Sequence, residues 1–235
     1  MLSWLLFGSP RLRCLVLSSG ILCGGDSIRI LSQLSYYSWS GGVSNIKSLQ
    51  TCYVGSIMEY NLLATTEKIL MSAASSQLWM NLRAVGDEEA RTNKTRIGGL
   101  IQGKTNLDPV EAIHLLREHL RSEPDRYDKL FRILPVIEWV ETSMDEIVGE
   151  VESQKEQVKP EDTFRVTVEK RRTDLGRLDV IDPVAAVFDN EVDLEEPDWV
   201  VLIEIIGGKT GVSIIREEDM LNVQKERAAL SLEAD

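Results

Sequence analysis

The sequence predicts an α+β protein made of two consecutive mixed units that follow an irregular N-terminal extension. The chain has 235 residues, enough for one large domain or two small ones. Its 43% hydrophobic and 27% charged residues are ordinary globular values, which predict a packed core. From Met58 onward, runs with helical periodicity alternate with short strand-like runs. We expect an extension (1–57), a first domain (58–141), a second domain (142–220) and a polar tail (221–235).

The extension differs in composition from the rest of the chain. Residues 1–55 hold four basic residues and one acidic residue, whereas the whole chain has a net charge of −12. The apolar stretch Cys14–Gly25 follows two arginines and resembles a signal peptide, but a membrane span needs about 20 apolar residues. We predict that the extension is disordered, or that it precedes a true start at Met58.

All three cysteines lie in this extension, at Cys14, Cys23 and Cys52. They match no zinc-site spacing, and no histidine lies near them in sequence. This cysteine usage fits a reducing, cytoplasmic compartment.

The first domain shows the element order βαββαβ, which is that of a ferredoxin-like unit. Asp108-Pro109 predicts a helix start, because an N-cap acid precedes proline at the first helical position. Pro135 lies inside the last strand and implies an edge strand or a bulge. The expected strands are Met58–Thr65, Glu89–Thr95, Gly98–Lys104 and Leu130–Val140, with a helix at Glu67–Val85 and another after Asp108.

The second domain opens with a helix that Ser143 caps, with Glu146 at the spacing of a capping box. Residues Thr163–Glu169 alternate between apolar and polar and predict a half-buried strand. Trp199–Ile206 is apolar except for Glu204, which predicts a central strand covered on both faces. A helix between these strands is expected from the stripe Leu178, Ile181, Ala185 and Phe188, with a kink or a late start at Pro183.

Net charge excludes indiscriminate binding to nucleic acid or to an anionic membrane, because an acidic protein is repelled by phosphate. Any RNA contact must therefore come from a local basic cluster. Lys170, Arg171 and Arg172, with Arg177 close behind, place four cations in eight residues at a strand exit. Such a cluster can hold a phosphate backbone, and a solvated basic loop is the alternative.

One stretch satisfies the phosphate-loop pattern G-x-x-x-x-G-K-[ST], from Gly98 to Thr105. A phosphate loop needs an apolar strand before it and a helix that begins within it. Here the preceding residues are polar and the next helix begins only at Asp108, so we interpret the motif as a strand.

No catalytic constellation or metal site emerges. His114 and His119 are five residues apart on one helix and do not share a face as an i, i+4 metal pair does. We therefore predict no metal, no cofactor and no catalytic residues.

Two stretches resemble a THUMP domain: Thr163–Asp174, and Val192–Gly207 with the following Thr210–Ile214. The spacing is similar to that of THUMP proteins that act as adaptors for the tRNA cytidine N4-acetyltransferase. In that family a ferredoxin-like domain precedes the THUMP domain. Gly176 departs from the family, whose members often have a serine cap there, and so does Pro183.

The resemblance implies a non-catalytic, cytoplasmic adaptor that binds the acceptor end of tRNA, with an acetyltransferase as partner and no membrane association. Two alternatives remain: a nucleotide-binding protein that uses Gly98–Thr105, and an RNA-binding module for another modification enzyme. The candidate RNA-binding residues are Lys170, Arg171, Arg172, Arg177, Lys209, Lys104 and Arg96.

Overall fold

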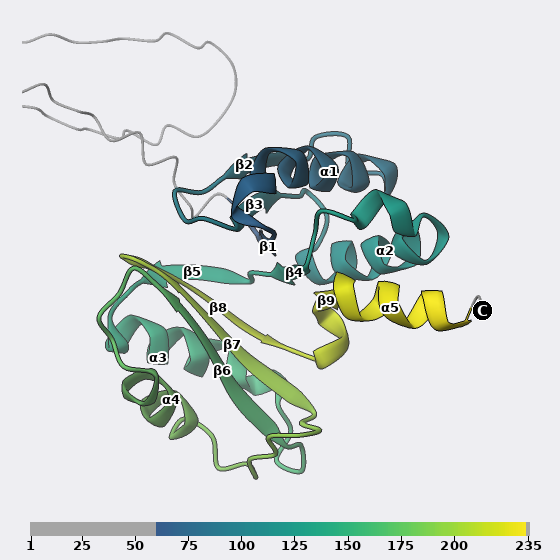
Figure 1. Cartoon of the computed structure of the whole chain (residues 1–235). Coiled ribbons are helices and arrows are strands. Elements are labelled where there is room, and N and C mark those ends of the chain that lie inside the picture. The colour runs from purple at the N-terminus through teal and green to yellow at the C-terminus, as the bar shows by residue number, and fades with distance from the viewer. Residues whose placement is uncertain (1–59, 234–235) are drawn as a thin grey trace, which may run out of the picture. The chain divides into compact units, whose positions relative to one another are not determined.

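The computed structural model describes residues 60–233, and the expected extension 1–57 lies outside the described residues. The described residues form two β-sheets, and each sheet has two helices against one of its faces (Figure 1).

The first sheet has the strand order β2-β3-β1-β4-β9, and all its neighbouring strands are antiparallel. The chain forms its first four strands in the order βαββαβ with helices α1 and α2. The strands are β1 (Leu62–Thr65), β2 (Arg91–Lys94), β3 (Leu100–Lys104), β4 (Arg132–Pro135) and β9 (Leu221–Asn222).

Helices α1 (Met71–Ala84) and α2 (Pro109–Ser122) cover one face of this sheet (Figure 1). Their buried side chains, such as Leu78 and Leu116, join Leu62 and Ile133 of the sheet in one apolar core. Asp108 begins α2 as expected, since its carboxylate accepts from the N–H groups of Val110 and Glu111 at 2.9 and 3.0 Å. Two short 3-10 helices, Lys68–Leu70 and Pro124–Tyr127, flank these elements.

The second sheet has the strand order β5-β8-β7-β6, in which β6 and β7 are parallel and the other neighbours antiparallel. Helices α3 and α4 cover one face, with Ile147, Val180 and Val201 in the shared core. The prediction of a capped helix after Ser143 is confirmed, because the Ser143 hydroxyl accepts from Glu146 N–H at 3.3 Å. The elements are β5 (Glu138–Glu141), α3 (Met144–Gln154), a 3-10 turn (Lys155–Gln157), β6 (Phe164–Arg171), α4 (Arg177–Ala185), β7 (Trp199–Ile206) and β8 (Lys209–Ile215).

The prediction of one strand over Leu130–Val140 is wrong. The segment forms β4 in the first sheet and β5 in the second, with only Val136 and Ile137 between them. Pro135, whose nitrogen carries no hydrogen to donate, is the last residue of β4, a position that strands tolerate for proline. The chain therefore passes from one sheet to the other at this proline.

The predicted buried stripe of α4 is also wrong in part. Leu178 is 67% exposed, whereas Val180 and Val184 are fully buried. Val180 and Val184 are four residues apart and therefore lie on one face of α4, and this face packs against the sheet. The helix has nine residues and contains Pro183.

The two sheets share apolar contacts on their helix-free faces. Leu63 and Leu100 of the first sheet pack in one cluster with Trp139 of β5. The Trp139 indole N–H donates to the carbonyl of Tyr60 at 2.6 Å. A second cluster joins Leu134 of β4 to Leu202 of β7. These contacts link the two sheets through buried side chains.

The expected polar tail contributes to the first sheet. Strand β9 pairs with β4, and helix α5 (Val223–Glu233) lies beside α2 (Figure 1). Arg117 of α2 donates to both carboxylate oxygens of Glu226 on α5, at 2.9 and 3.1 Å. Among residues 60–233, no helix is long and apolar enough to cross a membrane.

Candidate nucleic-acid interface

The structure brings several predicted RNA-binding cations together at one end of the second sheet. Arg171, at the end of β6, pairs in register with Ile206 of β7, which in turn pairs with Lys209 of β8. Neighbouring strands are about 4.8 Å apart, so these three residues span about 10 Å. The turn at Gly207 and Gly208 closes the same end, and Gly207 adopts a positive φ of 64°.

Arg172 connects this end of the second sheet to the first sheet. Its guanidinium donates to the carbonyl of Arg96, in the β2–β3 turn, at 2.6 Å. Arg172 also has φ 57°, and it is the only non-glycine residue with positive φ within residues 60–233. Such a conformation costs about 1–2 kcal/mol for a residue with a side chain and persists only where its surroundings determine it.

Arg171 has a different environment from its neighbours. Its guanidinium forms an ion pair with Glu204 of β7, with 2.5 Å between Nη1 and Oε2. The Glu204 side chain is 1% exposed. Burial raises the pKa of Glu204 to about 7, and Arg171 opposes that rise because it favours the charged carboxylate. The ion pair favours the charged carboxylate, whereas burial favours the neutral acid, and burial has the larger effect on the pKa of Glu204.

The other predicted cations near this end also make contacts within the chain. Lys170 is exposed, and its ammonium donates to the carbonyl of Leu175 at 2.6 Å. Lys209 forms an ion pair with Glu141 of β5. Arg177 begins α4, 4.0 Å from Glu169, in an exposed pair of little energetic weight. The N-terminus of α4 adds the positive end of a helix dipole to this region.

Lys104 lies apart from these residues. It ends β3, opposite Arg91, whereas the turn that contains Arg96 is at the other end of the same hairpin. The rise of a strand, about 3.3 Å per residue, places Lys104 about 13 Å beyond Leu100. The interpretation of Gly98–Thr105 as a strand is confirmed, because Leu100–Lys104 forms β3 and no helix begins within the motif.

Sequence reasoning missed Lys68. A Cβ placed on Gly98 would lie 2.9 Å from Cγ and Cδ of Lys68, so the lysine stem lies over the backbone of the β2–β3 turn. Lys68 is exposed and adds a cation beside Arg96. No local spacing could have revealed it, because the contact joins a turn to a segment 30 residues earlier.

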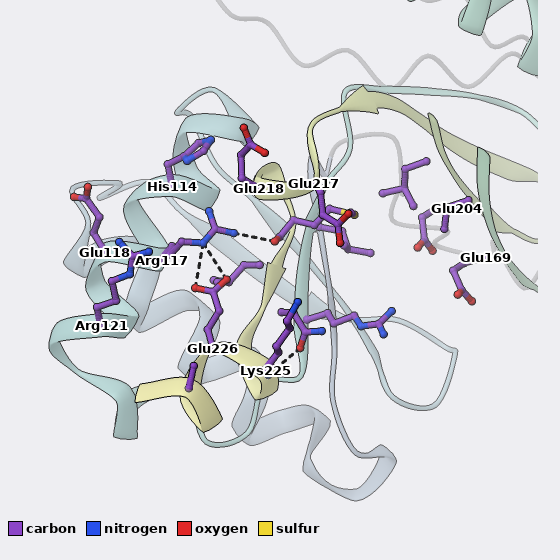
Figure 2. Close-up of a pocket in the computed structure, with 18 of the residues that line it drawn as sticks. His114, Arg117, Glu118, Arg121, Glu169, Glu204, Glu217, Glu218, Lys225 and Glu226 are labelled. Carbon is purple, nitrogen blue, oxygen red and sulfur yellow. Dashed lines mark hydrogen bonds and ion pairs between the residues drawn. The ribbon is translucent and has the colours of Figure 1, made fainter. Parts of the chain in front are cut away.

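A groove of about 980 Å³ lies elsewhere, between α2, α5 and β4 on one side and β6 and β7 on the other. Its floor contains Leu134, Leu202 and Met220. In Figure 2, Glu204 and Glu169 lie on the strands of the second sheet, apart from Arg117 and Glu226. Five arginine or lysine and six glutamate side chains line the groove, so its charge is close to balanced and does not favour phosphate.

The two histidines make internal hydrogen bonds. His114 bonds to the carboxylate of Asp219 at 2.7 Å, and His119 to the hydroxyl of Tyr127 at 2.9 Å. In the part of the chain that the structure describes, no three His, Cys, Asp or Glu side chains are grouped so that they could hold a metal ion.

Comparison with known families assigns the second sheet and its helices. Residues 141–215 match the model of the THUMP domain. These residues form a THUMP domain. It contains α3, β6, α4, β7 and β8 in full, and it ends with the last residue of β8. The THUMP domain thus supplies Lys170, Arg172 and Lys209, whereas Arg96 and Lys68 lie outside it.

Several known proteins are similar to this chain. The uncharacterized protein MJ0421 of Methanocaldococcus jannaschii is 33% identical over 119 residues, which are 46% of this chain and 33% of that protein. The crystal structure of PH1313 from Pyrococcus horikoshii is 24% identical with a TM-score of 0.46, over 67% of this chain and 55% of that one. The solution structure of the THUMP domain of THUMP domain-containing protein 1 is 24% identical with a TM-score of 0.27, over 30% of this chain and 81% of that one. The chain spans about a third of the length of the curated relative.

Proposed function

We propose that this protein is a tRNA-binding adaptor that presents tRNA to a modification enzyme and performs no chemistry itself. The observation that supports this most is the THUMP domain at residues 141–215, since the THUMP domain is an RNA-binding module of tRNA-modifying proteins. We propose that residues 62–135, with their βαββαβ order, act as the accompanying ferredoxin-like unit.

The proposed RNA surface is the basic cluster formed by Lys170, Arg172, Lys209, Arg96 and Lys68. Lys170, Arg172 and Lys209 lie in or next to strands of the second sheet. Arg96 and Lys68 lie in the β2–β3 turn and in the 3-10 helix before α1, and the Arg172–Arg96 hydrogen bond joins the two groups. Because the chain is acidic overall, such a local cluster orients the RNA: phosphate approaches here and is repelled elsewhere.

A charge-matched pair of variants tests this surface. Lys170→Glu, Arg172→Glu and Arg96→Glu together should weaken binding of labelled tRNA to the full chain, measured by fluorescence anisotropy. A plot of the logarithm of the tRNA binding constant against the logarithm of the salt concentration has a slope set by the number of phosphate contacts. Each lost contact should reduce the magnitude of this slope by about 0.7–0.9. The control replaces the exposed Lys155, Lys159 and Lys225 with Glu, which changes net charge equally and should leave the slope unchanged. Equal losses in both triple variants would refute the assignment.

For the partner, we propose a tRNA cytidine N4-acetyltransferase. An adaptor accelerates a reaction by positioning, because it replaces a bimolecular search with an oriented encounter. We therefore expect the protein to raise the rate of such an enzyme with full-length tRNA, and much less with a stem-loop that lacks the acceptor end. Acetylation by the purified chain alone would contradict the adaptor role.

A second candidate is the RNA-binding part of a larger modification enzyme. The observation that favours it is that the chain spans 33% of the curated relative's length. Modification of tRNA by a longer form of the protein, without a separate enzyme, would select this candidate.

A further inference from the structure

Glu204 is an unusual residue for its place in the fold. It is the only charged residue of the central strand β7. Among the described residues, the other buried acids are satisfied: Asp87 accepts from Thr105 and Asn106, and Asp219 from His114 and Arg216. One carboxylate oxygen of Glu204, in contrast, has no hydrogen-bond partner.

A buried ion pair is a poor source of stability. Desolvation of the two charges offsets their attraction, and apolar replacements of similar volume are often neutral or stabilising. The Arg171–Glu204 pair therefore calls for an explanation other than stability, and its position suggests one.

The pair lies at the end of β6, from which the proposed RNA contacts extend. Side chains alternate along β6, so Arg171 lies on the face with Glu204 whereas Lys170 points to the opposite face. The Arg171 carbonyl also accepts from Gly207 N–H at 2.8 Å. Arg171 is thus held through both its side chain and its backbone, immediately before the positive-φ residue Arg172.

We propose that Glu204 is a positioning residue for RNA binding: its ion pair with Arg171 holds the β6 exit in the conformation that presents Lys170 and Arg172. Arg171, predicted from sequence as a phosphate contact, then acts through the backbone. The proposal rests on the proposed tRNA-binding function. It adds a buried residue of β7 that is 33 residues from Arg171 in sequence.

The decisive variant replaces both partners, as Arg171→Met with Glu204→Met, so that no charge is left unpaired. It should remain folded, with an unfolding midpoint near that of the wild type. Its tRNA affinity should fall about tenfold, the order expected when binding must reorder the backbone of one residue. Its salt slope should stay unchanged, because no phosphate contact is lost.

The single variant Glu204→Gln keeps an oxygen that accepts from Arg171, so it should lose about threefold in affinity, between wild type and the double variant. The control is Glu138→Gln, which removes an exposed carboxylate of β5 in the same sheet but no contact to Arg171. It should bind within about twofold of wild type.

The outcomes separate the alternatives. An unchanged affinity in the folded double variant would overturn the positioning role. A salt slope lowered by about 0.7–0.9 would also overturn it, since Arg171 would then contact phosphate directly. A wild-type chain that binds no tRNA would overturn both the proposed function and this inference.

Discussion

At the scale of single residues, two residues at or near the proposed RNA surface are held in energetically unfavourable environments or conformations. Glu204 is buried with one oxygen unpartnered, and Arg172 has a left-handed backbone. Costly local states are often retained where a protein binds or reacts. Glu204 leads to a prediction about the pH dependence of stability, and Arg172 leads to one that separates stability from binding.

Glu204 should make stability depend on pH. Its folded pKa of about 7 is above the ordinary value of 4.5, so the folded chain binds this proton more tightly than the unfolded chain. This contribution to stability is present below pH 4.5 and is lost as pH rises through 7, with an upper size of about 3 kcal/mol. The denaturant midpoint of Glu204→Gln should therefore rise relative to that of the wild type as the pH is raised from about 5 to about 8. A constant difference across that range would show that Glu204 does not titrate there.

Arg172→Gly should separate folding from binding. Glycine adopts φ 57° without strain, which offsets its greater freedom in the unfolded chain. We expect an unfolding free energy within about 1 kcal/mol of wild type, and weaker tRNA binding because a cation is lost. Denaturation curves and anisotropy titrations measure the two quantities. Unchanged tRNA affinity would remove Arg172 from the interface.

At the scale of elements, helix starts and turns follow local chemistry. Asp108 caps α2 with two hydrogen bonds to its first turn. Asp108→Ala should cost about 1 kcal/mol of unfolding free energy, whereas Asp108→Asn keeps an accepting oxygen and should cost less. Tryptophan fluorescence during urea unfolding would measure both. Equal losses in the two variants would indicate that charge, and not the cap, is what matters.

The second prediction at this scale concerns strand β3 and the binding of ATP. Because Leu100–Lys104 is a strand, the Gly98–Thr105 motif has no helix N-terminus for a phosphate. We expect no saturable ATP binding in calorimetry, and tRNA binding by Lys104→Ala close to that of wild type. ATP hydrolysis that disappears in Lys104→Ala would instead support the nucleotide-binding alternative.

At the scale of the whole described fold, the contacts between sheets decide whether the basic cluster exists as one surface. Trp139 is 5% exposed and packs with residues of both sheets. Trp139→Ala should lower the free energy of unfolding by about 3–5 kcal/mol, and it should weaken tRNA binding in the fraction that stays folded. Trp79→Ala, at a residue 40% exposed on α1, is the control and should change stability by less than about 1 kcal/mol. If Trp139→Ala bound tRNA normally, contact between the sheets would not be needed for the interface.

Most helices and strands, and the RNA-binding module, could be predicted from the residues along the chain. Proline at 109 after Asp108, the alternation at Thr163–Glu169 and the apolar run Trp199–Ile206 act through local backbone and periodicity, which a sequence displays directly. The THUMP assignment came from the resemblance of Thr163–Asp174 and Val192–Gly207 to that domain, and residues 141–215 match the family model. The candidate cations were likewise found as a local run at 170–172.

The contacts that those cations make could not be predicted from the sequence, because they depend on how the strands pair and pack. Strand alternation and the register of β6 with β7 turned Arg171 toward Glu204, 33 residues away. The same packing brought Arg96 to Arg172 and laid Lys68 over Gly98, while Lys104 remained apart. The apparently single strand Leu130–Val140 was also divided between two sheets, because β4 pairs with β1 and β5 pairs with β8. Contacts between distant segments depend on how sheets pair and pack, and local residue spacing does not carry that information.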